Sequence, residues 1–329
     1  MSDPAITAPP RRDSACHYEL DVVAFAGASN WAVWVGQQQN YFAESGLNLR
    51  IKLTKSSMEM VQDLHSGSAQ VALTSVDNVI AYSAGQGEIS LKGPADFFAF
   101  MGVDDGLLSI MARPDIRSIN ELRGRVLGVD ALTTGYVFVL KELLSRNGVA
   151  DSEVFYSAIG TGAERLNALI AGSCDATLLN APLCLAAEHA GKVRLARAQT
   201  LLGPYQGIVG AASRRWAFHN THIVERFIWA FHHSLVWLGD PANKDAALEL
   251  LVDRMPAIKS VVSQTYDLLV TQGGLRKTLQ IDRQGTEHVI ALREKYGRAT
   301  RLGKAEQYID DRFRRAALAE TFRPSPTQP

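Results

Sequence analysis

The sequence predicts an α/β protein made of two lobes, each a mainly parallel sheet flanked by helices, with a ligand cleft between them. Strand and helix signals alternate along most of the 329 residues, which is the pattern of βαβ units. A chain of this length buries a large core and commonly divides into two units. Polar segments also follow several buried strands, and ligands bind at the carboxyl ends of parallel strands in open sheets.

The predicted elements follow from periodicity, capping residues and glycine stops. Strands are predicted at 18–25, 49–53, 71–73, 97–103, 108–112, 125–129, 154–159, 175–178, 193–196 and 207–213. Helices are predicted at 31–42, from 56 to the glycine at 67, 119–122, 136–147, 163–171, from 180, from 216, and at 242–252, 258–271 and 286–296. The helical pattern after residue 216 predicts that the C-terminal part packs as helices on the first lobe.

The first junction between strand and helix carries Asn30 and Trp31. Trp31 could stack on a flat ligand, and Asn30 could donate to a carboxylate or carbonyl. Aromatic side chains at i and i+3 of a helix usually pack, so Trp31 and Trp34 could equally both be core residues. We expect Trp31 in the cleft and Trp34 in the core.

Two further helix starts in the first lobe carry hydroxyl and carboxyl groups. Ser56 begins one helix, and Thr74, Ser75 and Asp77 join a buried strand to the next. Capping alone explains such residues and contributes about 1 kcal/mol. Free N–H groups at helix starts also favour anionic ligands. We therefore expect these four residues to cap and to line the cleft.

The second lobe offers a matching polar loop. Thr133 and Thr134 precede a predicted helix that Tyr136 begins, and Asn180 lies at a strand end. Hydroxyls beside a helix N-terminus form a plausible half-site for a carboxylate or sulfonate, and Tyr136 could close over an aromatic solute. Residues 160–162 (Gly-Thr-Gly) form a similar helix entry, but this spacing is a weak signal for phosphate.

The composition excludes several classes of partner. Lys plus Arg equals Asp plus Glu, at 34 each, so we expect neither nucleic acid nor an anionic membrane surface as a partner. No run reaches the about 18 consecutive apolar residues of a membrane span. The three cysteines form no CxxC pair and the eight histidines no HxxxH pair, so we expect no metal and no cofactor. A single bridge between Cys174 and Cys184 stays open.

The N-terminal residues 1–16 are polar and proline-rich, which predicts a disordered tail. They lack the apolar run of about 7–15 residues that a secretory signal needs. As the sequence stands we expect a cytoplasmic protein, or a periplasmic one if a leader lies upstream of this start.

Four segments of the sequence together resemble one known family. They read WAVWVGQQQNYFAESGLNLRI, VQDLHSGSAQVALTSVDNVIAY, SINELRGRVLGVD and ERLNALIAGSCDATLLNAP. They resemble the type II solute-binding proteins of ABC importers, in the branch that covers sulfonates, nitrate and thiamine-pyrimidine precursors. The resemblance covers roughly residues 18–210 and leaves the helical C-terminal part aside.

The resemblance implies the two-lobed type II periplasmic-binding-protein fold. Lobe 1 would comprise residues 17–102 and 206–329, and lobe 2 residues 103–205, with hinges near Val103-Asp104 and near 203–206. It also implies that a small polar solute, anionic or aromatic, is captured by lobe closure and delivered to an ABC permease by a monomeric protein.

Enzymes on the same fold form the alternative, together with ligand sensors. Fungal thiamine-pyrimidine synthases, which resemble this family, need a cysteine-rich run where this chain reads LLGPYQGIVG, and a histidine where it has Asn78. An aromatic decarboxylase, desulfinase or lyase that uses Asp77, His65 or Arg113 stays open. Because no catalytic constellation stands out, we expect binding without catalysis.

Overall fold

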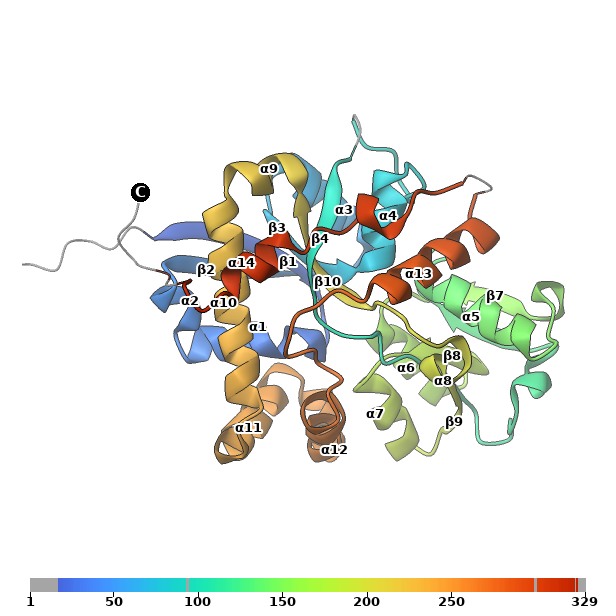
Figure 1. The fold of residues 1–329 in the computed structure, drawn as a ribbon. Coiled ribbons are helices and arrows are strands. Elements are labelled where there is room, and N and C mark those ends of the chain that lie inside the picture. Colours follow the sequence, from blue (N-terminus) through green and yellow to red (C-terminus); the bar gives the residue numbers. More distant parts are fainter. Residues whose placement is uncertain (1–16, 93–94, 299–300, 323, 325–329) are drawn as a thin grey trace, which may run out of the picture.

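A computed structural model describes residues 17–92, 95–298, 301–322 and 324. The predicted tail at 1–16, including Cys16, lies outside the described residues. Figure 1 shows two α/β units side by side, each with a sheet covered by helices. We use lobe 1 for the first sheet with its helices and lobe 2 for the second; their division at residues 102/103 and 205/206 remains a prediction.

The sheet of lobe 1 has the strand order β2-β1-β3-β10-β4. β1 pairs in parallel with β2 and β3, whereas β10 runs antiparallel to both of its neighbours. The strands are β1 (Tyr18–Phe25), β2 (Leu47–Thr54), β3 (Val71–Ser75), β4 (Phe97–Gly102) and β10 (Ile208–Ser213).

The sheet of lobe 2 repeats this arrangement in the order β7-β6-β8-β5-β9. β6 pairs in parallel with β7 and β8, and β5 runs antiparallel to β8 and β9. The strands are β5 (Ser109–Ala112), β6 (Val126–Val129), β7 (Phe155–Ala158), β8 (Ala176–Leu179) and β9 (Val193–Arg197). In each lobe the antiparallel strand is therefore the one that the chain enters from the other lobe.

Most helices belong to lobe 1, because the C-terminal third of the chain returns to it. Its helices are α1 (Trp31–Gln38), α2 (Tyr41–Glu44), α3 (Ser57–Ser66), α4 (Val76–Ser83), α9 (Arg214–His219), α10 (Thr221–Leu238), α11 (Lys244–Arg254), α12 (Val262–Tyr266), α13 (Arg283–Tyr296) and α14 (Arg312–Ala317). Those of lobe 2 are α5 (Gly135–Arg146), α6 (Gly162–Ala171), α7 (Leu183–His189) and α8 (Ala198–Leu202). Short 3-10 segments are η1 (Ala28–Asn30), η2 (Ile119–Leu122), η3 (Asp151–Glu153), η4 (Pro241–Asn243), η5 (Pro256–Val261) and η7 (Ala305–Gln307), and η6 (Asp267–Thr271) is a π-helix.

Two predicted helices differ from the observed ones. The helix expected over 31–42 is broken, because Asn40 adopts a left-handed conformation with φ 61° and separates α1 from α2. Asparagine tolerates this region better than most residues, so the apolar periodicity continues across a real break. The helix expected over 258–271 is a succession of η5, α12 and η6 rather than one α-helix.

The local start and stop signals agree with the structure. The side chain of Ser56 accepts a hydrogen bond from the amide of Glu59 and caps α3, and Gly67 ends this helix with φ 80°. Ser75 accepts from the amide of Asp77 and caps α4. These helix starts therefore follow from the residues at the junctions themselves.

The two connections between the lobes meet at Asp104. The Ser29 hydroxyl donates to Oδ2 of this carboxylate at 2.6 Å, and the amides of Gly106 and Ile208 both donate to Oδ1 at 2.9 Å. The connections touch at Gly207, where a Cβ would lie 2.1 Å from the amide nitrogen of Gly106. The buried carboxylate thus joins both crossovers to the start of α1.

Gln206 ties the hinge to the C-terminal part of the chain. Its side chain is fully buried, donates to the carbonyls of Asp104 and Ile208, and accepts from the amide of Asp282 at 2.7 Å. Asp282 caps α13, so Gln206 links the second connection between the lobes to the start of this helix.

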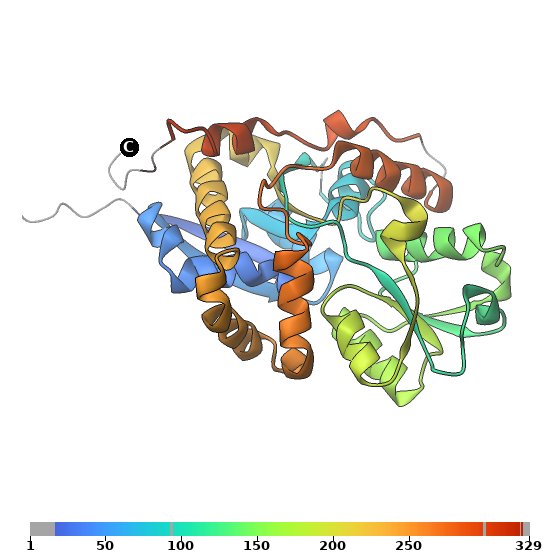
Figure 2. The same cartoon turned by 60° about the horizontal axis from the view of Figure 1, so that its bottom comes forward.

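Helix α13 lies along α5 of lobe 2 as well as α4 of lobe 1, as both Figure 1 and Figure 2 show. The apolar core also crosses the boundary between the lobes. One buried cluster contains Val71 of β3 together with Leu183 of α7, and the other contains Ile80 of α4 together with Phe138 of α5. The lobes therefore share packed surface on both sides of the hinge.

Candidate functional site

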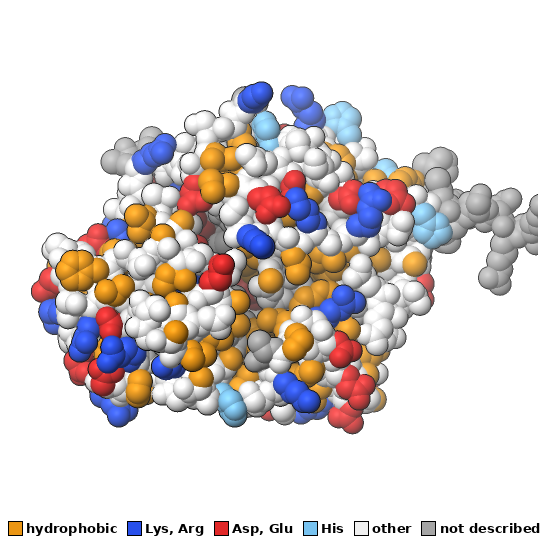
Figure 3. All heavy atoms as spheres, turned by 180° about the vertical axis from the view of Figure 1, so that it is seen from behind, with side chains coloured by type: hydrophobic (Ala, Val, Ile, Leu, Met, Phe, Trp, Pro, Cys, Tyr) orange, Lys and Arg blue, Asp and Glu red, His pale blue; other side chains and the backbone are white. Residues whose placement is uncertain are grey.

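Two pairs of helix starts approach each other from different lobes: α4 with α5, and α3 with α6. The surface view in Figure 3 shows a hollowed region on this face of the molecule. Asp77 in the first turn of α4 touches the start of α5, since a Cβ on Gly135 would lie 2.4 Å from Asp77 Cγ. Only glycine at position 135 permits this approach. Where α3 approaches α6, hydrogen bonds from Thr161 lower the pKa of Glu164 in α6. The charge of Lys55, which precedes α3, lowers that pKa further.

The dominant ion pair of this region joins Asp77 to Arg293 of α13. Arg293 Nε donates to Oδ1 at 2.7 Å and Nη2 to Oδ2 at 2.5 Å, and both side chains are only 2% exposed. Burial lowers the pKa of Arg293, but the charge of Asp77 and its hydrogen bonds outweigh burial and raise that pKa. Arg293 Nη2 also donates to the carbonyl of Thr133 at 3.4 Å, so the pair reaches lobe 2.

The other predicted residues of lobe 1 are engaged within that lobe. The Asn30 side chain donates to the carbonyl of Phe25 at 2.8 Å. Thr74 is buried and accepts from the Asn78 side chain at 2.9 Å. Ser56 and Ser75 are half-buried at the starts of α3 and α4, where they serve as caps. These side chains therefore already have partners or cap helices within lobe 1; that they line a cleft and touch a solute stays a prediction.

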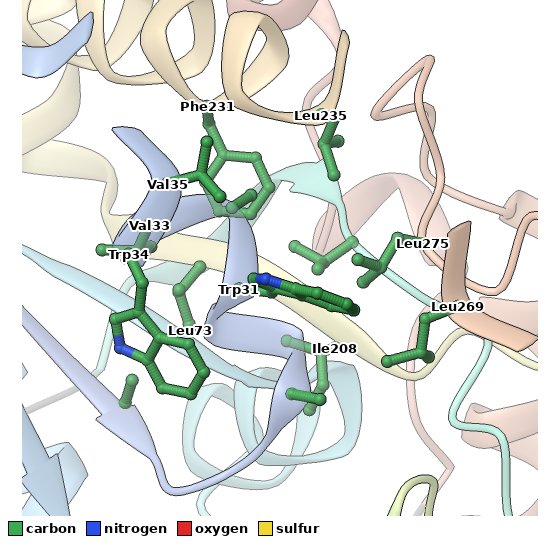
Figure 4. Packing of buried hydrophobic residues seen from close by; sticks show 14 of the residues in the cluster. Trp31, Val33, Trp34, Val35, Leu73, Ile208, Phe231, Leu235, Leu269 and Leu275 are labelled. Carbon is green, nitrogen blue, oxygen red and sulfur yellow. The ribbon is translucent and has the colours of Figure 1, made fainter. Parts of the chain in front are cut away.

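The two tryptophans do not show the expected contrast, because both are buried. Trp31 has no exposed surface, and Figure 4 shows its indole among Ile208, Leu269 and Leu275. Trp34 is 5% exposed. Trp31 was expected to open to the cleft, but the C-terminal segment around α12 and η6 covers it. Its indole N–H nevertheless has no hydrogen-bond partner among the described residues.

Lobe 2 contributes a buried arginine that sequence reasoning missed. Arg165 is 5% exposed, and its guanidinium donates to the carbonyls of Gly160 at 2.6 Å and Leu178 at 3.3 Å. Among the described residues no carboxylate lies within ion-pair distance of it. Arg165 Nη2 and Asn180 Oδ1 both lie 3.9 Å from the position of a Cβ on Gly162, so these two side chains converge at the start of α6.

The remaining predicted residues of lobe 2 lie at the start of α5. Thr133 is exposed, and Thr134 donates its hydroxyl to Asp130 at 2.8 Å. Tyr136 is half-buried; burial raises its pKa, and the charges of Asp104 and Asp130 raise it further. Its hydroxyl therefore stays protonated at neutral pH and is available as a donor.

Two small cavities flank the hinge, and Tyr205 lines both. One of about 160 Å³ lies between α5, α8 and α13 and includes Glu142 and Lys295. The other, of about 250 Å³, includes Arg276 and Asp282. In the first cavity Lys295 is paired with Glu142, and in the second Arg276 is paired with Asp282, so these cations already have carboxylate partners.

Both described cysteines are free thiols, so the bridge left open between Cys174 and Cys184 is not present. Burial raises the pKa of each thiol. Buried thiols with raised pKa values are poor nucleophiles.

A usable signal for the missed arginines was present in the sequence. Arg293 follows Val289 and Ile290 at helical spacing, and Arg165 shares the apolar side of α6 with Leu169. A charged residue on an apolar stripe predicts a buried partner or a ligand, because an unpaired buried charge is costly.

The fold defines a class of protein: the two-lobed periplasmic-binding-protein fold, built from two α/β lobes. Residues 29–243 match the family model described as NMT1/THI5 like, and the chain belongs to this family. The predicted type II fold and the stated resemblance are thereby confirmed. No protein of curated function matches this sequence.

Three solved structures illustrate the similarity. The alkanesulfonate-binding protein SsuA from Xanthomonas axonopodis pv. citri, bound to MOPS, has a TM-score of 0.71 and 15% identity, covering 88% of this chain and 97% of SsuA. A zinc-bound ligand-binding component of an ABC-type import system from Staphylococcus aureus has a TM-score of 0.72 and 12% identity, covering 91% and 98%. The periplasmic aliphatic sulphonate-binding protein SsuA from Escherichia coli has a TM-score of 0.67 and 17% identity, covering 88% and 91%. Identities this low establish the shared fold and leave function to be argued from the site.

The helices of the described residues are all too short or too polar to cross a bilayer.

Proposed function

We propose that this protein is the solute-binding component of an ABC-type importer and that it captures a small polar solute, anionic or aromatic, by lobe closure. Membership of the NMT1/THI5-like family supports the proposal, as do the similar structures of sulfonate-binding and import components. A periplasmic location and a membrane permease as partner belong to the same proposal. The solute classes to consider are sulfonates, carboxylates, nitrate and pyrimidine-like compounds.

Arg165 is the observation that carries the anionic part of the proposal. A buried cation costs several kcal/mol unless a partner or hydrogen bonds compensate it. Arg165 has two carbonyl partners and no carboxylate among the described residues. An anionic group beside Asn180, at the start of α6, would complete its coordination and gain from the free amides of the helix start.

Closure would bring the lobe 1 residues against this half-site. We propose that the solute is enclosed between the two sets of helix starts, where exclusion of water strengthens each polar contact. The candidate residues are Asn30, Ser56, Thr74, Ser75 and Asp77 from lobe 1, and Thr133, Thr134, Tyr136 and Asn180 from lobe 2.

We prefer capture over catalysis because the reactive groups near the cleft are already engaged. Asp77 is neutralised by Arg293, and the described cysteines are buried thiols. A carboxylate held in a bidentate pair is a poor general base.

Isothermal titration of the purified protein against ethanesulfonate, benzoate, nitrate and uracil tests the proposal. Saturable binding of an anion without turnover is expected. Replacement Arg165→Met should then lower the affinity for that anion by about 10- to 100-fold, the range of a hydrogen bond to a charged group. Arg165→Lys should recover part of the loss.

The matched control is Arg123→Met, which removes a partly exposed arginine of lobe 2 whose partner is Glu153. This variant should bind like the parent. Equal affinity of Arg165→Met and the parent, with both folded by circular dichroism, would refute the assigned anion site. Product formation detected by NMR would refute simple capture.

A further inference from the structure

Tyr205 holds a buried hydroxyl that the fold itself does not use. The residue lies in the second connection between the lobes and is 3% exposed. Its hydroxyl has no hydrogen-bond partner among the described residues. An unsatisfied buried polar group costs about 1–3 kcal/mol, so a phenylalanine here would suit the fold alone better than a tyrosine.

The ring of Tyr205 lies against Gly106, and the backbone of Tyr205 lies against Gly285. A Cβ on Gly106, in the first connection, would lie 3.0 Å from Tyr205 Cδ1. A Cβ on Gly285, in the first turn of α13, would lie 2.7 Å from the carbonyl carbon of Tyr205. The ring therefore packs against the first connection between the lobes, and the Tyr205 backbone packs against the start of α13.

The same connection runs past the start of α4. The amide of Val76 donates to the carbonyl of Gly207 at 3.0 Å, and Ile208 pairs with Ser75 between β10 and β3. Tyr205 therefore lies two residues before Gly207, which is hydrogen-bonded to the first residue of α4.

The electrostatic surroundings of the hydroxyl agree with this position. Burial raises its pKa, and the nearby Tyr136 and Asp77 raise it further. The Ser75 side chain, which approaches the hydroxyl, lowers that pKa. The hydroxyl is therefore a protonated donor between Ser75 of lobe 1 and Tyr136 of lobe 2.

We infer that Tyr205 is a specificity-determining residue that donates a hydrogen bond to an oxygen of the solute at the hinge end of the cleft. The inference rests on the proposed function and adds to it a second recognition element. Arg165 supplies charge from the lobe 2 wall, whereas Tyr205 supplies a directional neutral donor from the hinge. A solute with an oxygen acceptor would satisfy the hydroxyl only when both lobes surround it.

The test compares Tyr205→Phe with the parent protein in thermal unfolding and in titration with the tightest binder among ethanesulfonate, benzoate, nitrate and uracil. The melting temperature should stay equal or rise, because the unpaired hydroxyl is removed while the ring is kept. The affinity should fall about 5- to 30-fold, as expected for the loss of a hydrogen bond. The ionic-strength dependence of binding should persist in Tyr205→Phe and weaken in Arg165→Met, since only the latter removes a charge.

Tyr266→Phe is the matched control, because the Tyr266 hydroxyl is buried and donates to the carbonyl of Leu238 at 2.9 Å. It should show the opposite signature, a lower melting temperature with unchanged affinity. Unchanged affinity of Tyr205→Phe for an anion that the parent binds would overturn the inference and leave the proposed function standing. A lowered melting temperature would also overturn it by showing a structural role. If the parent binds none of the four compounds, the proposed function and the inference fail together.

Discussion

The two lobes share one strand order but use their cleft-facing polar groups differently. In lobe 1 these groups are already bonded: Asp77 to Arg293, Asn30 to Phe25, and Thr74 to Asn78. In lobe 2 a buried guanidinium and a half-buried phenol face the same region without a carboxylate partner among the described residues. The polar groups of lobe 1 therefore already have partners, whereas Arg165 of lobe 2 has no carboxylate partner among the described residues.

The C-terminal part of the chain explains this difference. It adds α9–α14, and α13 brings Arg293 to the start of α4. Lobe 2 receives no such addition at the start of α6, and no carboxylate of the described residues lies within ion-pair distance of Arg165, which donates to two carbonyls instead. Two lobes with the same strand order can therefore differ in the pairing of their polar groups when only one of them carries additional helices.

The largest effect on stability should follow from removing the ion pair between Asp77 and Arg293. Asp77→Ala leaves Arg293 buried without its carboxylate, and we expect the free energy of unfolding to fall by about 3–5 kcal/mol. Urea denaturation measures this loss. The double replacement Asp77→Leu with Arg293→Leu should lose much less, because no buried charge remains.

A loss below about 1 kcal/mol for Asp77→Ala, the range of exposed ion pairs, would show that Asp77 and Arg293 do not form a strong buried pair in lobe 1.

A smaller, pH-dependent effect should follow from Glu142, which links α5 to α13. Burial raises its pKa, but hydrogen bonds from Lys295, Arg146 and Tyr296 outweigh burial and bring the pKa to about 2. A lowered folded-state pKa adds stability that is complete above the ordinary value of 4.5 and is lost as the pH falls towards 2. Because Lys295 is half-exposed, solvent screens part of the gain, and Glu142→Gln should lose about 1–2 kcal/mol at pH 7.

The stability difference between Glu142→Gln and the parent should shrink between pH 4.5 and pH 2. Chemical denaturation at a series of pH values checks this, and a constant difference over that window would contradict the assignment.

The smallest effects should be equal in the two lobes, because they are local. Ser56 caps α3 and Thr161 caps α6, each accepting from a backbone amide. Ser56→Ala and Thr161→Ala should each lower the free energy of unfolding by about 1 kcal/mol. The exposed Ser173→Ala serves as the control and should change it by less than about 0.5 kcal/mol. Clearly unequal losses at the two caps would show that the surrounding lobe, not the local cap, sets their strength.

The elements that sequence reasoning found share one physical basis. The strands at 18–25 and 71–73 follow from short apolar runs, and the stop at Gly67 follows from a backbone conformation that glycine permits. The break at Asn40 was missed, because a left-handed asparagine leaves the apolar pattern undisturbed.

The candidate site was predictable only in outline. The junctions at Thr74–Asp77 and Thr133–Tyr136 do meet between the lobes, as the strand–helix alternation implied. The roles of Arg165 and Tyr205 were not visible, since both depend on which groups surround them after folding.

The sequence alone determined the alternation of strands and helices, the caps, the glycine stops and the family, because each of these depends on neighbours close in the chain. The tertiary structure decided which charges are neutralised. Asp77 and Arg293 are 216 residues apart, and no local pattern could pair them. Their pairing, and the lack of one for Arg165, arise from the packing of α13 across both lobes, where burial makes each unpaired charge costly.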